Sequence, residues 1–160
     1  MNIGSGSGYP ESALSNFAPH AFVFDGIDCA SMEGLLQSFK FKNEMMQVYV
    51  CTLVGKKAKF KGKPKKWYKT QTLWWKGVEI KRDSLEYQAL LDSAFTALST
   101  NTKFIKALTA TNNAVLKHSM GKSDTSRTVL TTSEFCSRLT KIRDGIEINQ
   151  NEDFWSLFNT

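Results

Sequence analysis

The sequence has few of the residues that build metal sites and disulfide frameworks: three cysteines and two histidines among 160 residues. The cysteines, Cys29, Cys51 and Cys136, are odd in number, widely spaced and form no Cys-x-x-Cys pair. Neither His20 nor His118 lies near one of them in the sequence. We therefore expect no metal, no cofactor and no disulfide framework, and a reducing, cytoplasmic location.

Long hydrophobic runs are also missing. No apolar segment approaches the roughly 20 residues of a membrane-spanning helix, and the N-terminal "MNIGSGSGYPES" does not have the layout of a secretion signal. Hydrophobic residues make up 41% of the chain, enough to build one core. We expect a single domain over 1–160, with a loop lead-in at 1–13 and a C-terminal tail at 146–160 whose aromatic residues pack back on it. No membrane partner is expected, and the chain should be a monomer or weak oligomer.

Basic residues outnumber acidic ones, giving a net charge of +6, and they gather in one segment. Eleven of the 21 basic residues lie within residues 56–82, the basic segment, against the single acid Glu79. Trp67, Tyr68, Trp74 and Trp75 are interleaved with these basic residues. Positive charge among aromatic rings is typical of surfaces that bind phosphates and stack bases, so nucleic acid is an expected partner. A solvated lysine-rich face with the tryptophans in the core is the alternative.

The first third of the chain predicts a hairpin followed by a helix. Phenylalanines alternate in "HAFVFDGIDCAS", and its Asp-Gly pair is a two-residue turn signal, so residues 20–31 should form a hairpin. Ser31 is a good N-cap for a helix that runs to about Lys42. A second helix is expected over 45–53, followed by a basic connection at 55–64.

Helices also dominate the expectation for the rest of the chain. Residues 74–98 are predicted as one long helix because their apolar side chains fall near helical spacing. Residues 103–108 should form a short helix and 119–126 a loop. Ser133 is the expected N-cap of a last helix that ends near Gly145. The fold class is therefore α+β, predominantly helical, with a small N-terminal β-hairpin.

One line of polar residues runs along the helix predicted at 31–42. At about 100° and 1.5 Å per residue, Glu33, Gln37 and Lys40 lie nearly above one another, spanning about 10 Å. That span exceeds an i,i+4 ion pair and suits two groups that converge on a small ligand. Gly34 costs up to about 1 kcal/mol relative to Ala, which indicates close approach of a ligand or a neighbouring backbone. The alternative is the ordinary polar stripe of a surface helix.

Three motifs with compatible gaps occupy this first third: Ser15-Asn16-Phe17, the turn Asp25-Gly26, and Glu33-x-x-x-Gln37-x-x-Lys40-Phe41. Together they resemble the NADAR (YbiA-like) family. "AKFKGK" at 58–63 is similar to the family's Ala-x-x-x-Gly-Arg stretch. Trp75 takes the place of the tryptophan that opens the family's long helix, with Trp67 as the rival candidate. The family's late Trp-Gly-x-Gly loop is replaced here by "SMGKSDTSRTV".

The resemblance implies a NADAR-like fold and an enzyme, a hydrolase of N-glycosidic bonds on ribosylated amines. We expect a glycohydrolase that removes ADP-ribose from guanine in DNA, RNA or free nucleotides, reversing ADP-ribosylation in an antitoxin-like role. The basic segment favours this substrate over the phosphoribosylamine intermediates of riboflavin synthesis, which are the enzymatic alternative. A non-catalytic module that binds ADP-ribose or nucleic acid is the other alternative.

The reaction that the resemblance implies suggests catalytic roles for Glu33 and Lys40 on the predicted helix. A ribose bonded to an exocyclic amine opens to an imine at C1, where a neutral lysine displaces the amine through a Schiff base. A carboxyl group moves the protons. Lys40 and Glu33 fit these two roles, with Asp124 as a second catalytic carboxylate. In a variant mechanism, Lys40 only polarises the sugar, while Glu33 stabilises an oxocarbenium ion or activates water.

The remaining candidates bind the substrate. Asn16 would hydrogen-bond the ribose or a base edge, and Phe17 or Trp75 would stack on a base. Gln37 would hold a ribose hydroxyl, and the three lysines within 59–63 would meet the pyrophosphate. The expected substrate-binding residues are therefore Ser15, Asn16, Phe17, Gln37, Lys61, Lys63 and Trp75.

Overall fold

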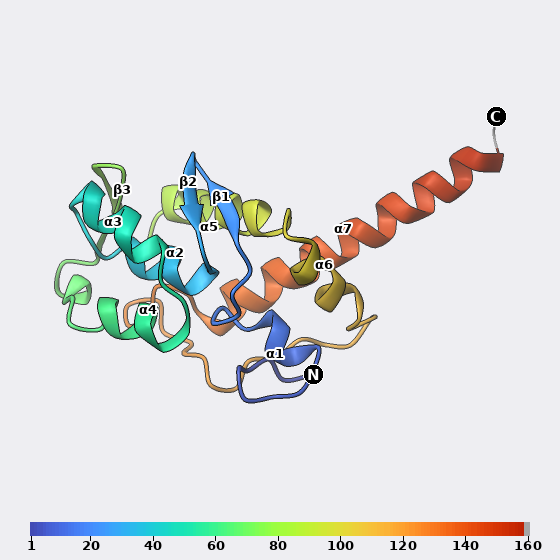
Figure 1. The fold of residues 1–160 in the computed structure, drawn as a ribbon, viewed down its shortest axis with the longest axis horizontal. Coiled ribbons are helices and arrows are strands. Elements are labelled where there is room, and N and C mark those ends of the chain that lie inside the picture. Colours follow the sequence, from blue (N-terminus) through green and yellow to red (C-terminus); the bar gives the residue numbers. More distant parts are fainter. Residues whose placement is uncertain (159–160) are drawn as a thin grey trace.

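The structure, a computed structural model, describes the backbone of residues 1–158 and the side chains of residues 1–146. Short helices pack with two small hairpins, and a long helix leads away from them (Figure 1). In chain order the elements are α1 (Glu11–Leu14), β1 (Phe22–Phe24), β2 (Ile27–Cys29), α2 (Met32–Ser38), α3 (Glu44–Cys51), α4 (Gly55–Gly62), the 3-10 helix η1 (Trp67–Lys69), β3 (Thr72–Trp75), β4 (Val78–Lys81), α5 (Leu85–Leu98), α6 (Thr102–Thr109) and α7 (Thr132–Phe158). The predicted α+β, mainly helical class is confirmed. Among the described residues, no helix has the length and apolarity needed to cross a bilayer.

The N-terminal hairpin forms where the Asp-Gly signal predicts it. Strands β1 and β2 pair antiparallel, with Phe22 opposite Cys29. Asp25 and Gly26 both have positive φ, 49° and 78°, as a two-residue type I′ turn requires. Phe22 and Phe24 point into the core, where they are 5% and 6% exposed.

A second hairpin, β3–β4, replaces the first part of the helix predicted at 74–98, so the predicted start of that helix is wrong, while its remainder forms α5 (Leu85–Leu98). Lys76 and Gly77 have φ of 47° and 81° and form another two-residue turn. Leu73 and Trp75 face the core, 0% and 7% exposed, and the helix begins only at α5. A Lys-Gly turn carries a weaker signal than Asp-Gly, which explains the error.

Helix α2 is shorter than predicted. The Ser31 side chain caps it by accepting a hydrogen bond from the Gly34 amide, 3.1 Å away, as predicted. The helix ends at Ser38, and the Lys40 amide donates to the Gln37 carbonyl (3.1 Å), an i−3 bond typical of a tightening last turn. Lys40 therefore sits two residues past the end of α2.

Gly34 is explained by a neighbouring backbone. A Cβ at this position would lie 2.6 Å from the Leu53 carbonyl oxygen and 2.9 Å from that of Val50. Gly34→Ala is expected to lower the free energy of unfolding by about 1–3 kcal/mol through overpacking, measured by urea denaturation. Gly145→Ala is the matched control, since nothing lies within 4 Å of its Cβ and Ala favours a helix interior. Equal effects of the two substitutions would contradict this account.

Helix α7 begins earlier and runs further than predicted. Thr131, not Ser133, caps it: the Thr131 hydroxyl accepts from the Glu134 amide (3.1 Å), and the Glu134 carboxylate accepts from the Thr131 amide (2.8 Å). This reciprocal pair is a capping box. The helix continues past Gly145 to Phe158 and leads away from the other elements (Figure 1). The aromatic side chains predicted to pack back lie outside the described side chains.

The first residues of the chain pair with the segment around Lys117. The Ile3 amide donates to the Lys117 carbonyl (2.7 Å), and the Lys117 amide donates to the Met1 carbonyl (2.9 Å). Ile3 is 1% exposed in the core. The expected loop lead-in at 1–13 therefore contains a paired segment at its beginning and the helical turn α1 at its end. This pairing also positions the late loop, residues 118–130, because that loop follows Lys117 directly.

Candidate active site

Glu33 and Gln37 lie on one face of α2 and are joined to each other. The Gln37 side-chain amide donates to a Glu33 carboxylate oxygen at 2.9 Å. The Glu33 backbone amide donates to the Asn16 carbonyl at 3.0 Å, which brings the Ser15-Asn16-Phe17 segment beside α2. Three of the predicted residues, from two separate motifs, are therefore assembled at one place.

Burial governs the charge of Glu33. Its removal from solvent raises the pKa of the carboxyl group above its ordinary value, and the Gln37 hydrogen bond acts against this. The positive charges of Lys40, Lys59 and His118 act in the same lowering sense without reversing the shift. A carboxyl with a raised pKa keeps its proton closer to neutral pH, as a general acid requires.

Lys40 shows the opposite shift. Burial lowers its pKa from 10.5 to about 8, while the negative charge of Glu33 acts to raise it. The nearby charges of Lys122 and Lys59 lower the pKa further. A far larger fraction of this amine is therefore neutral and nucleophilic near neutral pH than for an ordinary lysine.

Two buried polar atoms at this site have no hydrogen-bond partner among the described residues: Asn16 Oδ1 and Gln37 Oε1. Buried acceptors are normally satisfied, so each is suited to a donor supplied by a ligand, such as a sugar hydroxyl. The position of Gln37 is set by Gly62 at the end of α4, because a Cβ on Gly62 would overlap the Gln37 side-chain oxygen.

The lysines predicted at the pyrophosphate are only partly assembled. Lys59 of α4 acts electrostatically on both Glu33 and Lys40. Lys61 and Lys63, which are exposed as Lys59 is, place their ammonium groups 5.5 Å and 5.7 Å from the ring centroids of Tyr49 and Phe60. Lys59 is therefore the lysine of α4 that the structure associates with the pair.

Ser15 and Phe17 have local roles. The Ser15 hydroxyl accepts a hydrogen bond from the Phe17 amide at 3.2 Å and so stabilises the turn that carries Asn16. Phe17 is half-buried, and its ring lies beside Gly55 at the start of α4. It is therefore close to the segments that form the site, and its role in stacking on a base stays a prediction.

Trp75 packs in the core rather than in an open site. Its ring centroid lies 5.2 Å from that of Phe24 and 5.7 Å from that of Phe39. Its indole N–H donates to the Asp25 carboxylate at 2.9 Å, and the residue is 7% exposed. The expectation that it opens a long helix and stacks on a base is corrected: it fastens the two hairpins together.

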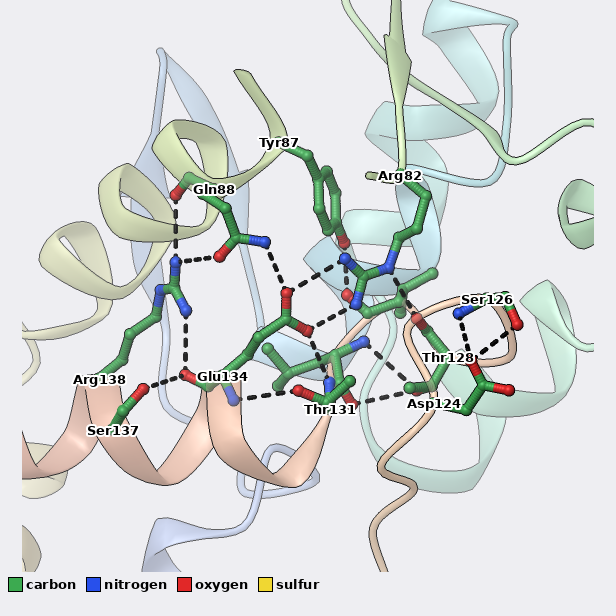
Figure 2. A network of polar contacts seen from close by, with 12 residues as sticks. Arg82, Tyr87, Gln88, Asp124, Ser126, Thr128, Thr131, Glu134, Ser137 and Arg138 are labelled. Carbon is green, nitrogen blue, oxygen red and sulfur yellow. Dashed lines mark hydrogen bonds and ion pairs between the residues drawn. The ribbon is translucent and has the colours of Figure 1, made fainter. Parts of the chain in front are cut away.

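Asp124 is an exposed turn residue of the late loop. Its carboxylate accepts from the Ser126 amide (2.9 Å) and hydroxyl (2.7 Å), as Figure 2 shows. These hydrogen bonds lower the pKa of Asp124, whereas a proton donor at neutral pH needs a raised pKa. The structure therefore gives Asp124 a role in shaping the loop in place of the expected catalytic one.

Two further residues at the site, His118 and Lys122, carry no sequence signal. The Nδ1 atom of the His118 ring lies 2.8 Å from the Ile3 carbonyl oxygen, 115 residues away in the sequence. Docking of the N-terminus thus brings its side chain toward Glu33. Among the described residues, no group of three or more His, Cys, Asp or Glu side chains is arranged to hold a metal ion.

The elements and their order define a protein with the YbiA fold. The NMR structure of E. coli YbiA superimposes with a TM-score of 0.61, covering 95% of this chain and 87% of that one, at 18% identity. Residues 8–144 match the family described as Bacteriophage protein GP30.3, so the chain belongs to that family. A relative from Enterobacteria phage T4, the uncharacterized 17.1 kDa protein in the Gp30-rIII intergenic region, is 38% identical over 151 residues, which is 91% of this chain and 98% of the relative.

Proposed function

We propose that this protein is an N-glycoside hydrolase that removes ADP-ribose from guanine. The observation that carries the proposal is the Glu33–Lys40 pair, a carboxyl with a raised pKa and an amine with a lowered pKa, each within the electrostatic influence of the other. Oppositely shifted acid and amine groups are a recurrent feature of active sites. The motif resemblance to the NADAR family and the YbiA fold support the choice of reaction.

In the first half of the reaction, Glu33 protonates the ribose ring oxygen. The C1–O bond breaks while the lone pair of the guanine amine forms a C1=N bond. The neutral amine of Lys40 then adds to C1. A proton passes from Lys40 to the guanine nitrogen, the C1–N bond to guanine breaks, and Lys40 is left bound to C1 as a Schiff base.

In the second half, the Glu33 carboxylate takes a proton from a water molecule as the oxygen of that water adds to C1. Glu33 then gives this proton to the lysine nitrogen, the C1–N bond to Lys40 breaks as the C1 hydroxyl becomes a carbonyl, and Glu33 takes up the hydroxyl proton. Addition of the free ribose hydroxyl to C1 closes the ring and yields ADP-ribose. The unpartnered oxygens of Asn16 and Gln37 accept hydrogen bonds from ribose hydroxyls. Lys59 and Lys122 supply positive charge for the pyrophosphate.

The direct test uses an oligonucleotide that carries ADP-ribose on one guanine. Incubation with the protein is expected to release ADP-ribose and restore the unmodified strand, followed by mass spectrometry. Glu33→Gln keeps the shape and the Gln37 contact but has no transferable carboxyl proton, and it should be inactive. Turnover of a phosphoribosylamine alone, or of neither substrate by folded protein, would overturn the proposal.

The proton affinity of Lys40 gives a separate prediction. Labelling by trace acetic anhydride across pH 6–11, quantified by peptide mass spectrometry, should follow the neutral amine with a midpoint near the lowered pKa of about 8. Lys59→Met removes a positive charge that lowers the pKa, so the midpoint should rise. Glu33→Gln removes the negative charge that raises it, so the midpoint should fall. A midpoint near the ordinary value of about 10.4 in all three proteins would refute the assignment.

Gly62 gives a third prediction. Gly62→Ala should displace the Gln37 amide and break its hydrogen bond to Glu33. We expect kcat/KM to fall by about tenfold, because this corresponds to the loss of one charge-assisted hydrogen bond. Because the effect acts through Gln37, adding Gly62→Ala to Gln37→Ala should cause little further loss. Independent, additive losses in the double variant would show that Gly62 acts by another route.

A further inference from the structure

A pocket of about 410 Å³ is lined in part by Lys40. Its lining includes Lys40, Lys65, Lys66, Trp74 and Lys81, whereas Glu33 is not among the lining residues. We call it the lysine pocket. The proposed chemistry requires C1 of the sugar between Lys40 and Glu33, so C1 would lie at the rim of this pocket and another part of the substrate would lie inside it.

The second hairpin forms one wall of the lysine pocket. Thr72 pairs with Lys81, and Trp74 pairs with Glu79, so the pleat places these four side chains on one face. The other face carries Leu73 and Trp75, which are in the core. The half-buried Trp74 side chain therefore faces the pocket. Lys42, which does not line the pocket, holds its ammonium 5.1 Å from the Trp74 ring centroid.

The charge of the pocket suits an extended anion. Four lysines line it against one acid, Glu79, which lies 3.4 Å from Lys81. Lys81 also donates to the Thr72 hydroxyl at 2.8 Å, so its ammonium is held in place at the wall. Lys65 and Lys66 come from a different segment and are exposed, so positive charge is presented at two separate points.

We propose that the lysine pocket binds a nucleotide that flanks the modified guanine in a single-stranded nucleic acid. Trp74 stacks on its base, and Lys65, Lys66 and Lys81 contact the phosphates on either side. Proteins bind single-stranded nucleic acids with aromatic rings placed between separated basic side chains. Every base offers a π-face to the ring, and every phosphodiester linkage offers a negative charge to a lysine. A paired base in a duplex presents its face to its neighbours in the stack and not to Trp74. The assignment rests on the proposed function for the identity of the substrate.

The binding test uses an unmodified, fluorescein-labelled 12-mer single strand, as DNA and as RNA, and fluorescence anisotropy. Lys65→Gln/Lys66→Gln should weaken binding about tenfold or more and reduce the slope of log K against log salt by about 1.4, for two phosphates. The matched control is Lys103→Gln/Lys106→Gln on α6, which lies away from β3 in Figure 1 and loses the same charge. The control should change affinity less than twofold. Equal weakening in both, or tighter binding of duplex DNA than of either single strand, would overturn the proposal.

Stacking is tested separately. Trp74→Ala should weaken binding at least fivefold, and Trp74→Phe, which keeps a ring and guards against loss of folding, should restore most of the affinity. Full affinity in Trp74→Ala would show that the ring does not hold a base.

A further experiment compares kcat/KM for cleavage of the modified oligonucleotide with kcat/KM for free ADP-ribosyl-guanosine. Lys65→Gln/Lys66→Gln should lower kcat/KM about tenfold for the oligonucleotide and leave the free nucleoside unchanged. Equal losses on both would place ADP-ribose itself in the pocket and overturn the assignment. If no protein cleaves either substrate, the proposed function fails, while a selective loss of strand binding would still support the pocket as a nucleic-acid site.

Discussion

Lys40→Ala is expected to reduce cleavage of ADP-ribosylated guanine by about a thousandfold or more. The substitution removes the nucleophile, and losses of this size are usual when a residue that forms a covalent intermediate is deleted. Only binding and electrostatic stabilisation by the remaining residues would act on the substrate. The measurement is kcat/KM for release of ADP-ribose, with folding checked by thermal denaturation.

Lys40→Arg separates the two mechanisms open to this site. A guanidinium keeps the positive charge but stays protonated, so it cannot form a Schiff base. If Lys40 acts as a nucleophile, Arg and Ala should be equally inactive. Sodium borohydride should trap ADP-ribose on Lys40 of the wild-type protein, and on neither variant. An active Lys40→Arg protein, or an adduct that persists without Lys40, would favour the mechanism in which Lys40 only polarises the sugar.

The local parts of the fold were predictable from sequence, since they depend on neighbouring residues. Asp25-Gly26 indicated the first hairpin, and Ser31 the start of α2. The Thr131–Glu134 capping box is also present in the sequence as a Thr-x-x-Glu pattern, but the neighbouring Ser133 carries a competing N-cap signal. The error at 74–98 arose because apolar residues on a short strand and on the following helix together imitate helical spacing.

The residues of the candidate site also differ in whether neighbouring sequence or distant contacts determine their position. Glu33, Gln37 and Lys40 could be placed by spacing because one short segment carries all three. Lys122 and His118 could not, since they reach the pair through the late loop and through pairing of the N-terminus with Lys117. Gly34 shows the converse: its cost indicated close approach of a ligand or a backbone, and the close neighbours are the backbone carbonyls of Val50 and Cys51 in α3 and of Leu53, two residues past its end.

A buried ion-pair network fastens the late loop to the helical core. Arg82, 1% exposed, donates to both carboxylate oxygens of Glu134 at 2.6 and 3.1 Å, and its Nε donates to the Thr128 carbonyl at 2.8 Å (Figure 2). Gln88 donates to the same carboxylate at 2.7 Å. Burial by itself raises the pKa of Glu134, but the hydrogen bonds from Arg82, Gln88 and the Thr131 amide, together with the charge of Arg82, outweigh it and leave the pKa lowered.

Glu134→Met is expected to lower the free energy of unfolding by about 3–5 kcal/mol, because it leaves the Arg82 guanidinium buried without its counter-ion. Arg82→Met should cost a similar amount by isolating the Glu134 carboxylate. The double variant should lose clearly less than the sum of the two, since neither charge is then left unpaired. Urea denaturation of the four proteins measures this coupling.

The exposed pair formed by Lys81 and Glu79 is the matched control for this network. Its atoms are 3.4 Å apart and its side chains are 59% and 52% exposed, so Glu79→Gln should change stability by at most about 1 kcal/mol. Additive losses in the Arg82/Glu134 cycle would contradict a coupled buried pair. Because Arg82 also holds Thr128, a coupled result would mean that the position of the late loop, and with it Lys122 beside Lys40, depends on a charge network outside the proposed catalytic pair.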